Sequence, residues 1–342
     1  MRAVILAAGE GTRLRPLTDR RPKHMIAMAG RPLIEHIVEA FRDNGVAKFT
    51  IVLGYKRETI ETHLSDGRAL GVEIDYVYQP KPMGTADAVA KLQNRFEEPR
   101  FLLQYGDVYV TPNAVREIVK ALNESEIDAA VAVVKVEDQS QYGLVMIEDG
   151  YVKNIVEKPE KGSSSGLANA GIYALDKNIF DAVKRTRRSS RGELELTDSI
   201  GNLAGQGFKV KPVLITREDW VDVGRPWDLL ATNERALGAL QPKVEGEVES
   251  TAVLMGPVTV RSSAKILSGS RVEGPTYVGE GSVVGPNCYI RPYTSIGQYV
   301  RVGNGCEIKN CIIMNHTKIP HQSYFGDSII GEGCNFGAGT IT

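Results

Sequence analysis

A six-residue period dominates the last quarter of the 342-residue chain. From Leu254 to Met314 every sixth residue is apolar, and glycine follows several of these positions, for example at Gly279 and Gly297. Neither a strand, with a period of 2, nor a helix, with a period of 3.6, produces this pattern. It is the hexapeptide signature of a parallel β-helix, in which each hexad forms one short face and its apolar residue fills the interior. We therefore expect a left-handed parallel β-helix over residues 253–342, with a chance pattern in an antiparallel β domain as the alternative.

The phase of this repeat predicts which side chains point inward. The apolar series runs through Leu254, Val260, Ile266, Val272, Val278, Val284, Ile290, Ile296, Val302, Ile308 and Met314. The frame slips after Met314 and resumes at Tyr324, Ile330 and Phe336. We expect these residues to face the interior, and glycine or asparagine to occupy the corners, where the backbone needs a positive φ.

Residues 1–238 have a different organisation, in which apolar runs alternate with segments of helical periodicity. The expected strands are 3–8, 49–55, 72–79, 101–108 and 129–136, and the expected helices are 32–45, 58–67, 84–96, 113–125 and 227–240. This alternation predicts an α/β fold with a Rossmann-like, mostly parallel sheet and helices on both faces. We expect a polar linker at 239–252 between this domain and the β-helix.

Composition excludes several classes of protein. The formal net charge is -1, which gives no support for binding to nucleic acid or to a membrane surface. No apolar run reaches the length of about 20 residues that a membrane span needs, and the run at 3–8 is too short for a signal peptide. We therefore expect a cytoplasmic protein. Its cysteines lack Cys-x-x-Cys spacing, so we expect free thiols and no zinc site. They are Cys288, Cys306, Cys311 and Cys334.

A glycine-rich, basic loop follows the first expected strand. It reads LAAGEGTRLRPLTDRRPK and includes Gly9, Gly11, Arg13 and Lys23. A lone Gly-x-Gly is weak evidence for dinucleotide binding, and the third glycine of that fingerprint is missing. Ligands of such sheets bind beyond the carboxyl ends of the strands, so backbone N–H groups and basic side chains here could hold a phosphate chain. The alternative is a solvated basic loop.

Two isolated carboxylates follow apolar segments of the same half. Asp107 comes after the run 101–106, and Asp222 lies within WVDVG. Mg²⁺ is often held by one or two carboxylates together with substrate phosphates. Either aspartate alone could instead be a helix cap or a turn residue. Together with the basic loop they indicate phosphate chemistry at a metal ion.

These segments resemble the sugar-1-phosphate nucleotidylyltransferases over nearly all of residues 1–235. The matching motifs, in family order, are LAAGEGTRLRPLT with RPK, QPKPMGTA at 79–86, GD at 106–107, EKP at 157–159, NAGIY at 169–173 and WVDVG at 220–224. The resemblance implies that the oxygen of a sugar 1-phosphate attacks the α-phosphorus of UTP or dTTP and that pyrophosphate leaves. Such a transfer depends on in-line positioning and charge neutralisation. N-acetylglucosamine 1-phosphate and glucose 1-phosphate are the expected sugars.

The resemblance also implies roles for individual residues. Arg13 and Lys23 would be catalytic, and Asp107 and Asp222 would hold Mg²⁺. The nucleotide-binding residues would be Leu6, Ala7, Ala8, Gly9, Gly11, Thr12, Gln79, Gly84 and Thr85. The sugar-phosphate-binding residues would be Tyr105, Gly106, Gly143, Glu157, Lys158 and Asn169. Pairing of the base with Gln79 and Gly84 favours uracil or thymine over guanine.

The hexapeptide region resembles the acetyltransferase half of the bifunctional N-acetylglucosamine-1-phosphate uridylyltransferase/glucosamine-1-phosphate acetyltransferase family. The matching segments are YIRPYTSIG at 289–297, VGNGCEIKN at 302–310, HQSYFGDSIIGEG at 321–333 and NFGAGTIT at 335–342. The resemblance implies acetyl-CoA as a co-substrate and His321 as general base, a role that histidine often fills near neutral pH. Arg291 and Lys309 would bind the sugar phosphate of the acetyl acceptor, and Tyr324 and Asn335 its sugar. A pure oligomerisation scaffold with a surface histidine is the alternative.

Two departures from that family shape the remaining expectations. The spacing of Arg13 and Lys23 is more similar to hexose-1-phosphate thymidylyl- and uridylyltransferases, and archaeal-type bifunctional proteins combine both patterns. The chain ends at Thr342 within a motif, so we expect a C-terminally truncated protein with weak acetyl transfer. Side-by-side packing of β-helices predicts a homotrimer. The competing interpretations are a mannose-1-phosphate guanylyltransferase and a non-catalytic assembly or regulatory subunit of the same architecture.

Overall fold

The computed structural model describes residues 1–138, 141–157 and 165–342, and these form two compact units. The first contains Met1–Met25 and Leu33–Asp222, and the second contains Ile26–Pro32 and Val223–Thr342. Helix α7 (Pro226–Gly238) therefore belongs to the second unit, although we expected its residues in the first domain. Strand β14 (Glu247–Val248) lies within the segment that we expected to be a linker.

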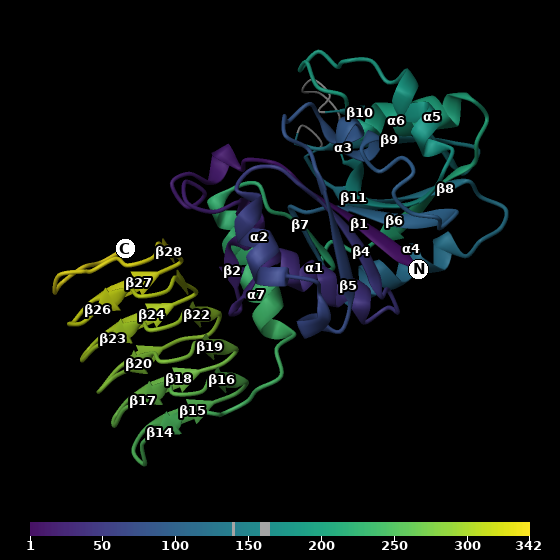
Figure 1. The fold of residues 1–342 in the computed structure, drawn as a ribbon. Coiled ribbons are helices and arrows are strands. Elements are labelled where there is room, and N and C mark those ends of the chain that lie inside the picture. The colour runs from purple at the N-terminus through teal and green to yellow at the C-terminus, as the bar shows by residue number, and fades with distance from the viewer. Residues whose placement is uncertain (139–140, 158–164) are drawn as a thin grey trace. The chain divides into compact units, whose positions relative to one another are not determined.

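Four parallel strands form the centre of the first unit. They lie in the order β6-β1-β4-β5 and are β1 (Arg2–Ala7), β4 (Lys48–Leu53), β5 (Glu73–Tyr78) and β6 (Arg100–Tyr105) (Figure 1). The helices between and after them are α1 (Leu33–Arg42), α2 (Arg57–Leu64), α3 (Thr85–Ala90) and α4 (Pro112–Leu122). The strand–helix alternation in the sequence predicted these elements, and the mostly parallel α/β fold is confirmed.

An antiparallel extension, which the sequence did not predict, completes the nine-stranded sheet. Its long strand β11 (Gly166–Asp176) runs antiparallel to both β6 and β8 (Ala129–Val136). The other strands are β9 (Gly143–Glu148), β10 (Tyr151–Glu157) and β12 (Val210–Ile215). A separate two-stranded sheet pairs β7 (Val108–Val110) with β13 (Trp220–Asp222). These strands place residues from 105 to 222 around the carboxyl end of β1.

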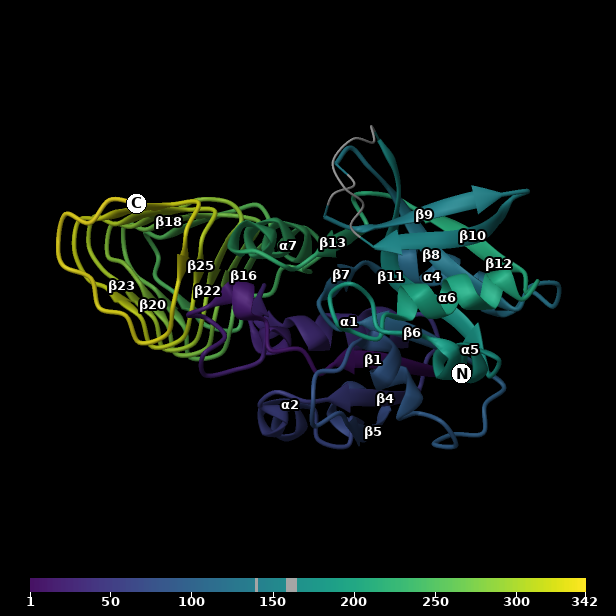
Figure 2. The same ribbon diagram turned by 90° about the horizontal axis from the view of Figure 1, so that it is seen from above.

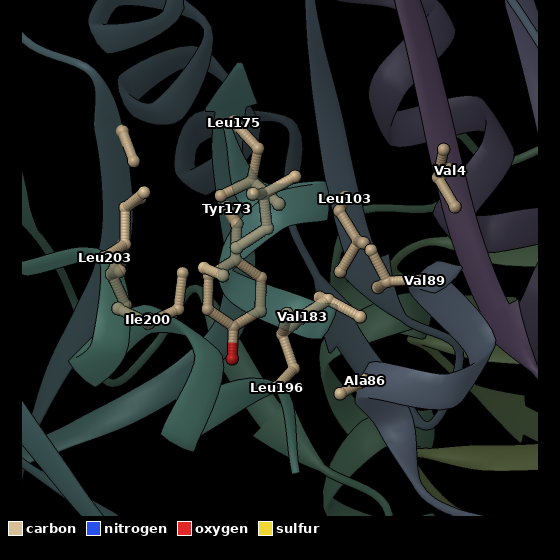
Figure 3. Close-up of a cluster of buried hydrophobic side chains, with 14 of the residues drawn as sticks. Val4, Ala86, Val89, Leu103, Tyr173, Leu175, Val183, Leu196, Ile200 and Leu203 are labelled. Atoms are coloured by element: carbon tan, nitrogen blue, oxygen red, sulfur yellow. The ribbon is translucent and has the colours of Figure 1, made fainter. Parts of the chain in front are cut away.

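A buried apolar cluster lies between the sheet and the helices α3, α5 (Ile179–Arg185) and α6 (Leu196–Gly205). Figure 3 shows Tyr173 of β11 among side chains of α5 and α6, including Val183 and Ile200. Tyr173 and Ile200 are fully buried, and removal of such apolar surface from water is the main stabilising contribution in a core of this kind. The cluster thereby packs α5 and α6 against the sheet.

The second unit contains the β-helix, formed by three parallel five-stranded sheets (Figures 1 and 2). The first sheet consists of β14, β17 (Lys265–Ile266), β20 (Val283–Val284), β23 (Arg301–Val302) and β26 (Lys318–Ile319). The second consists of β15 (Val253–Met255), β18 (Arg271–Glu273), β21 (Tyr289–Ile290), β24 (Glu307–Lys309) and β27 (Tyr324–Gly326). The third consists of β16 (Val258–Val260), β19 (Thr276–Val278), β22 (Thr294–Ile296), β25 (Ile312–Ile313) and β28 (Ile329–Ile330). The architecture predicted from the six-residue period is confirmed.

The interior series follows the predicted frame as far as Ile308 and then departs from it. Val278 pairs with Ile296, 18 positions further on, but Ile296 pairs with Ile313, 17 positions further on. Ile313 and Phe325 belong to the interior cluster, so the expectation that Met314 and Tyr324 belong to the series was wrong. The expected Ile330 belongs to the cluster and Phe336 packs against it. One residue is missing between Ile308 and Ile313 and another between Phe325 and Ile330, so the phase shifts twice while the strands stay stacked.

A short hairpin from the N-terminal part of the sequence also belongs to the second unit. Its strands are β2 (Ala27–Met28) and β3 (Arg31–Pro32). Met28 and Ala29 are almost fully buried. Helix α7 packs against β2 and β22, so the hairpin, the helix and one face of the β-helix form a single packed body. Over the described residues, the structure has no helix with the length and apolar character needed to cross a membrane.

Candidate active site

The loop after β1 is folded back on itself and lies against Lys23. Gly11 has φ 67°, and a Cβ atom at this position would lie 3.0 Å from Cβ of Lys23. A larger residue would therefore be strained and crowded. The Thr18 hydroxyl donates a hydrogen bond of 2.9 Å to the carbonyl oxygen of Gly11. Thr12 opens the short 3₁₀ helix η1 (Thr12–Leu14), and Arg13 on this helix is exposed and lines the cavity.

Lys23 and Asp107 form a buried ion pair at the end of this loop. Lys23 begins the 3₁₀ helix η2 (Lys23–Met25), and its ammonium group donates to Oδ2 of Asp107. The two side chains are 12% and 25% exposed. Burial by itself raises the pKa of Asp107, but the Lys23 charge and hydrogen bond outweigh burial, so the pKa is lowered. Asp107 is therefore an ionised carboxylate at neutral pH.

Gly106 and His24 bring the end of β6 close to the basic loop. A Cβ atom on Gly106 would lie 2.8 Å from the carbonyl oxygen of Leu6 and 2.9 Å from Cδ2 of His24, so only glycine fits. His24 lines the cavity, and burial, reinforced by the Lys23 charge, lowers its pKa to about 3. His24 is therefore neutral. Sequence reasoning did not identify it, because a single histidine next to Lys23 has no distinctive pattern.

Asp222 lies beside Asp107 because β13 pairs with β7. Asp222 is opposite Val108 in the register, directly after Asp107 in the chain, and both aspartates line the cavity. Among the residues that the structure describes, no three acidic, histidine or cysteine side chains form a metal-binding group. Two carboxylates beside a phosphate-binding loop nevertheless suit Mg²⁺, which takes its other ligands from phosphate oxygens and water. The donor set therefore fits a magnesium ion.

Two polar residues that line the cavity, Tyr105 and Asn169, are joined by a chain of hydrogen bonds through the buried Tyr173. Asn169 donates from Nδ2 to the Tyr173 hydroxyl at 2.7 Å, and that hydroxyl donates to the Tyr105 hydroxyl at 3.0 Å. Oδ1 of Asn169 accepts the Gly171 N–H at 3.0 Å. Burial raises the pKa of both tyrosines, so they remain neutral. Asn169 is therefore held by both ends of its amide group.

A second group of charged side chains also lines the cavity. Arg191 is 3.5 Å from Glu157 and 3.3 Å from Glu195, and all three line the cavity. Burial raises the pKa of Glu195, while the Arg191 charge opposes the increase. A Cβ atom on Gly143 would lie 3.0 Å from Oε2 of Glu157. Sequence reasoning missed Arg191 and Glu195, although the basic run at 185–191 was a signal that could have been used.

Gln79 also lines the cavity. It is almost fully buried, and its amide nitrogen donates to the Gly84 carbonyl oxygen at 3.0 Å and to Oδ2 of Asp87 at 2.9 Å. Gly84 has φ 112°, and a Cβ atom there would lie 2.3 Å from the Leu194 carbonyl oxygen. The Thr85 hydroxyl accepts the Leu196 N–H at 2.8 Å. These contacts fix the orientation of the Gln79 amide.

Most of these residues line one cavity of about 580 Å³ within the first unit. The predicted site residues that line it are Leu6, Ala8, Gly9, Gly11, Thr12, Arg13, Lys23, Gln79, Gly84, Thr85, Tyr105, Asp107, Gly143, Glu157, Asn169 and Asp222. Ala7 is buried in β1, and Gly106 supports Asp107 from behind. Lys158 lies outside the described residues. Residues from Leu6 to Asp222 are thus brought together.

The predicted acetyl-acceptor residues lie on the β-helix. Arg291 and Lys309 follow the inward-facing residues of β21 and β24, and Tyr324 begins β27 on the same sheet. Arg291 pairs with Glu307 at 3.0 Å, and Lys309 pairs with Asp327 at 3.2 Å. His321 is exposed before β27, and Asn335 forms a bridge to Lys318 on the neighbouring sheet. The structure therefore places three of the five along one sheet, His321 shortly before its strand β27, and Asn335 on the neighbouring sheet.

The geometry of the first unit agrees with a comparison against protein-family models. Residues 2–238 match the model described as nucleotidyl transferase, and residues 272–341 match the GMPPB C-terminal domain. The chain belongs to the nucleotidyl transferase family. The predicted class of enzyme is thereby confirmed, and the cavity described above lies entirely within the matched part of this nucleotidyltransferase.

Relatives of this nucleotidyltransferase are similar along its whole length. The bifunctional protein GlmU of Methanocaldococcus jannaschii is 41% identical over 344 residues, which cover 100% of this chain and 80% of that protein. A bifunctional sugar-1-phosphate nucleotidylyltransferase/acetyltransferase of Sulfurisphaera tokodaii is 39% identical, with coverage of 100% and 82%. Among solved structures, a Bacillus anthracis protein assigned as a glucose-1-phosphate thymidylyltransferase superposes with a TM-score of 0.62 and 28% identity, covering 68% of this chain and 94% of that one.

Proposed function

We propose that this nucleotidyltransferase transfers a uridylyl or thymidylyl group from UTP or dTTP to a sugar 1-phosphate and releases pyrophosphate. The observation that most supports this is the convergence of the loop at 9–13, Lys23, Asp107 and Asp222 on one cavity. Anion-binding backbone, a buried cation and two carboxylates are the groups that phosphoryl chemistry at a metal ion requires. The named activities of the relatives point in the same direction.

In the proposed reaction, a phosphate oxygen of the sugar 1-phosphate forms a bond to the α-phosphorus of the nucleotide. The bond from the α-phosphorus to the bridging oxygen of pyrophosphate breaks, and the electron pair leaves with pyrophosphate. Backbone N–H groups of the loop at 9–12 bind the triphosphate, and Arg13 and Lys23 neutralise the charge that develops on the leaving group. Lys23 needs no rearrangement for this role, because Asp107 already holds its ammonium group in place.

Asp107 and Asp222 would hold Mg²⁺. When bound, the ion supplies charge neutralisation between the phosphate groups. The chain's own contribution is to place the ionised carboxylate of Asp107 near the carboxylate of Asp222. The register of β7 and β13 and the lowered pKa of Asp107 account for that placement.

Glu157 and Asn169 would accept and donate hydrogen bonds to sugar hydroxyls. Support comes from Asn169, whose amide is oriented by Tyr173 and Gly171. Lys158 remains a predicted ligand of the sugar phosphate. We add Arg191 to that subsite, because it is a cavity cation that reaches Glu157 and Glu195.

Gln79 supports the choice of UTP or dTTP. Its amide nitrogen is engaged by Gly84 and Asp87, so its carbonyl oxygen is the atom left to meet a base. An acceptor at this point suits the N3–H of uracil or thymine and disfavours the N3 acceptor of cytosine or the N1 acceptor of adenine. Guanine presents an N1–H, so GTP with mannose 1-phosphate stays as the alternative that the substrate screen must test.

We further propose that the β-helix acetylates an amino-sugar 1-phosphate with acetyl-CoA. In this step the amine attacks the thioester carbonyl, His321 takes the amine proton and coenzyme A leaves as the thiol. Arg291 and Lys309 would bind the sugar phosphate in exchange for their partners Glu307 and Asp327, and Tyr324 and Asn335 would contact the sugar. A homotrimer assembled through the β-helix and a cytoplasmic location remain predictions.

A pyrophosphate-release screen tests the first activity. It crosses UTP, dTTP, GTP and ATP with the 1-phosphates of glucose, N-acetylglucosamine and mannose. We expect turnover with UTP or dTTP and with glucose or N-acetylglucosamine 1-phosphate. Turnover restricted to GTP and mannose 1-phosphate would favour the guanylyltransferase alternative. No turnover with any pair would favour a non-catalytic subunit.

A further inference from the structure

A buried hydrogen-bonded group joins three distant segments of the second unit. The Ala29 N–H, in the turn between β2 and β3, donates to Oδ1 of Asn233 at 2.9 Å and to Oγ of Ser295 at 3.2 Å. Oγ of Ser295 donates to Oδ1 of Asn233 at 2.6 Å, and Nδ2 of Asn233 donates to the Tyr293 carbonyl oxygen at 2.9 Å. We call Ala29, Asn233, Tyr293 and Ser295 the Ala29 cluster. It connects the hairpin, α7 and the β-helix.

The Ala29 cluster has the properties of a rigid junction. Ala29, Asn233 and Ser295 are at most 5% exposed. The contacts engage both ends of the Asn233 amide and use the Ser295 hydroxyl as donor and acceptor. A buried polar network with its members satisfied specifies one arrangement, because any displacement leaves a buried donor or acceptor without a partner.

Gly30 brings the hairpin into direct contact with the β-helix. It has φ 80°, and a Cβ atom at Gly30 would lie 2.1 Å from Cζ of Tyr277, on β19. The turn of the hairpin therefore sits on the tyrosine ring. This position accepts only a residue without a side chain, for reasons of both backbone conformation and space.

The chain on either side of this junction leads to the candidate active site. Lys23 precedes Ala29 by six positions, and Asp222 precedes Asn233 by eleven. The hairpin segment begins at Ile26, directly after η2, and α7 begins at Pro226. The two segments that bear a phosphate-binding lysine and a metal-binding aspartate in the proposed function are therefore fastened to each other by the Ala29 cluster.

We propose that Asn233 and Ser295 are positioning residues for nucleotidyl transfer, so that a β-helix serine contributes to the reaction of the other unit. The Ala29 cluster fixes the position of the hairpin that follows Lys23 and of the helix α7 that follows Asp222. This inference rests on the proposed roles of Lys23 and Asp222. It predicts that loosening the junction lowers kcat, because Lys23 acts on the leaving group, and leaves the KM for the sugar phosphate nearly unchanged.

The first test compares two buried serines of the β-helix. Ser295→Ala removes a hydrogen bond from the Ala29 cluster. Ser282→Ala is the matched control, since Ser282 is fully buried, donates to the Gly297 carbonyl oxygen at 2.7 Å and accepts the Val300 N–H at 2.9 Å, remote from the hairpin in sequence. We expect kcat to fall about 5-fold in Ser295→Ala, the equivalent of one typical hydrogen bond, and to stay at the wild-type value in Ser282→Ala. Equal kcat in the two variants would overturn the proposal.

A structural readout accompanies the kinetics. Hydrogen exchange at residues 23–29 should speed up in Ser295→Ala and not in Ser282→Ala, because only the former loosens the hairpin. Melting temperatures and circular dichroism of both variants establish that they are folded. Unchanged exchange at 23–29 together with lowered kcat would contradict positioning through the hairpin.

The second test introduces a steric clash between the hairpin and Tyr277 and then removes it with a second substitution. Gly30→Ala places a methyl group in the Tyr277 ring, and we expect kcat to fall on the order of 10²-fold, the effect of a displacement of about 1 Å. Tyr277→Ala in the same chain should restore at least a tenth of the wild-type kcat, although the positive φ remains unfavourable for alanine. A Gly30→Ala enzyme with wild-type kcat, or one that Tyr277→Ala fails to improve, would overturn the proposal. Inactive wild-type enzyme would instead refute the proposed function itself.

Discussion

The two candidate sites of this chain differ in how their charges are held. In the first unit, Lys23 and Asp107 are paired inside a cavity of about 580 Å³ and are mostly shielded from water. On the β-helix, Arg291 and Lys309 are paired across neighbouring coils with Glu307 and Asp327, and each of the four side chains is at least 38% exposed. Electrostatic interactions are strong in the first environment and screened in the second. Charge interactions in the enclosed site are therefore the stronger of the two.

The same difference supports the proposed assembly. An exposed phosphate-binding site becomes effective when another surface excludes water from it, because desolvation strengthens its charge interactions. The β-helix face bearing Tyr324 is open in a single chain, whereas the face bearing Ser295 is covered by α7 and the hairpin. A second copy of the chain on the open faces would supply the missing cover. The homotrimer is a prediction that sedimentation analysis can test.

The largest expected effect separates the two sites through His321. His321→Ala should reduce acetyl transfer to an amino-sugar 1-phosphate by a factor on the order of 10²–10⁴, the range for loss of a general base. Uridylyl transfer should be unchanged, because His321 belongs to the second unit and does not line the cavity. Release of the coenzyme A thiol measures the first reaction, and release of pyrophosphate measures the second.

His316→Ala provides the control for this experiment, since His316 is another exposed β-helix histidine, stacked on Tyr299. It should leave both reactions intact. Equal loss of both activities in His321→Ala would show that the sites are not independent. Undiminished acetylation would remove His321 from the mechanism.

A second prediction concerns the phase of the β-helix. Phe325→Ala should lower the free energy of unfolding by about 3–5 kcal/mol, because Phe325 is fully buried between Ile308 and its neighbours in the interior. Tyr324→Ala should cost much less, since Tyr324 is only half-buried and lies outside the interior cluster. Urea unfolding followed by circular dichroism gives both values. A larger loss in Tyr324→Ala would restore the frame predicted from the sequence.

This one-residue phase error shows what the sequence could and could not predict. The interior series from Val260 to Ile308 was correct, because one apolar residue per hexad is dictated by the narrow interior of a β-helix. The loss of a corner residue leaves the composition of the surrounding sequence unchanged, so the phase shift leaves no signal in the sequence. Met314 is itself apolar and well buried, so composition could not distinguish it from Ile313.

In the first unit, too, some elements were predicted from the sequence and others were not. Periodicity predicted β1, β4, β5, β6 and β8, because strand–helix alternation is a local pattern. The strands β9 to β12 were missed. The pairing of β11 with β6 and of β12 with β8 joins segments that are far apart in the sequence, so no local pattern indicates it. His24 has no distinctive sequence pattern, and only the folded chain brings it beside Asp107. Arg191 lies in a basic run, but its place beside Glu157 also depends on the fold.

A third prediction tests the enclosed ion pair. Lys23→Ala should lower kcat of nucleotidyl transfer by a factor on the order of 10²–10³, the usual effect of removing one donor that acts in the transition state. Arg20→Ala is the control, because Arg20 is an exposed cation of the same loop that does not line the cavity. Both kcat and KM are measured by pyrophosphate release. Wild-type turnover in Lys23→Ala would contradict the assignment.

The smallest expected effect concerns the metal ion and again contrasts the two units. Asp107→Asn and Asp222→Asn should each raise the Mg²⁺ concentration for half-maximal rate on the order of tenfold, equivalent to about 1.4 kcal/mol of binding free energy, because each replaces a charged oxygen ligand with a neutral amide. Asp327→Asn serves as the control, since this β-helix carboxylate also pairs with a lysine, Lys309, but lies outside the cavity. Binding of Mn²⁺ in the presence of nucleotide, followed by calorimetry, should weaken in the first two variants and not in the third. An unchanged Mg²⁺ titration in both Asp107→Asn and Asp222→Asn would mean that these carboxylates only support the fold, and the Lys23–Asp107 pair would then be a structural ion pair.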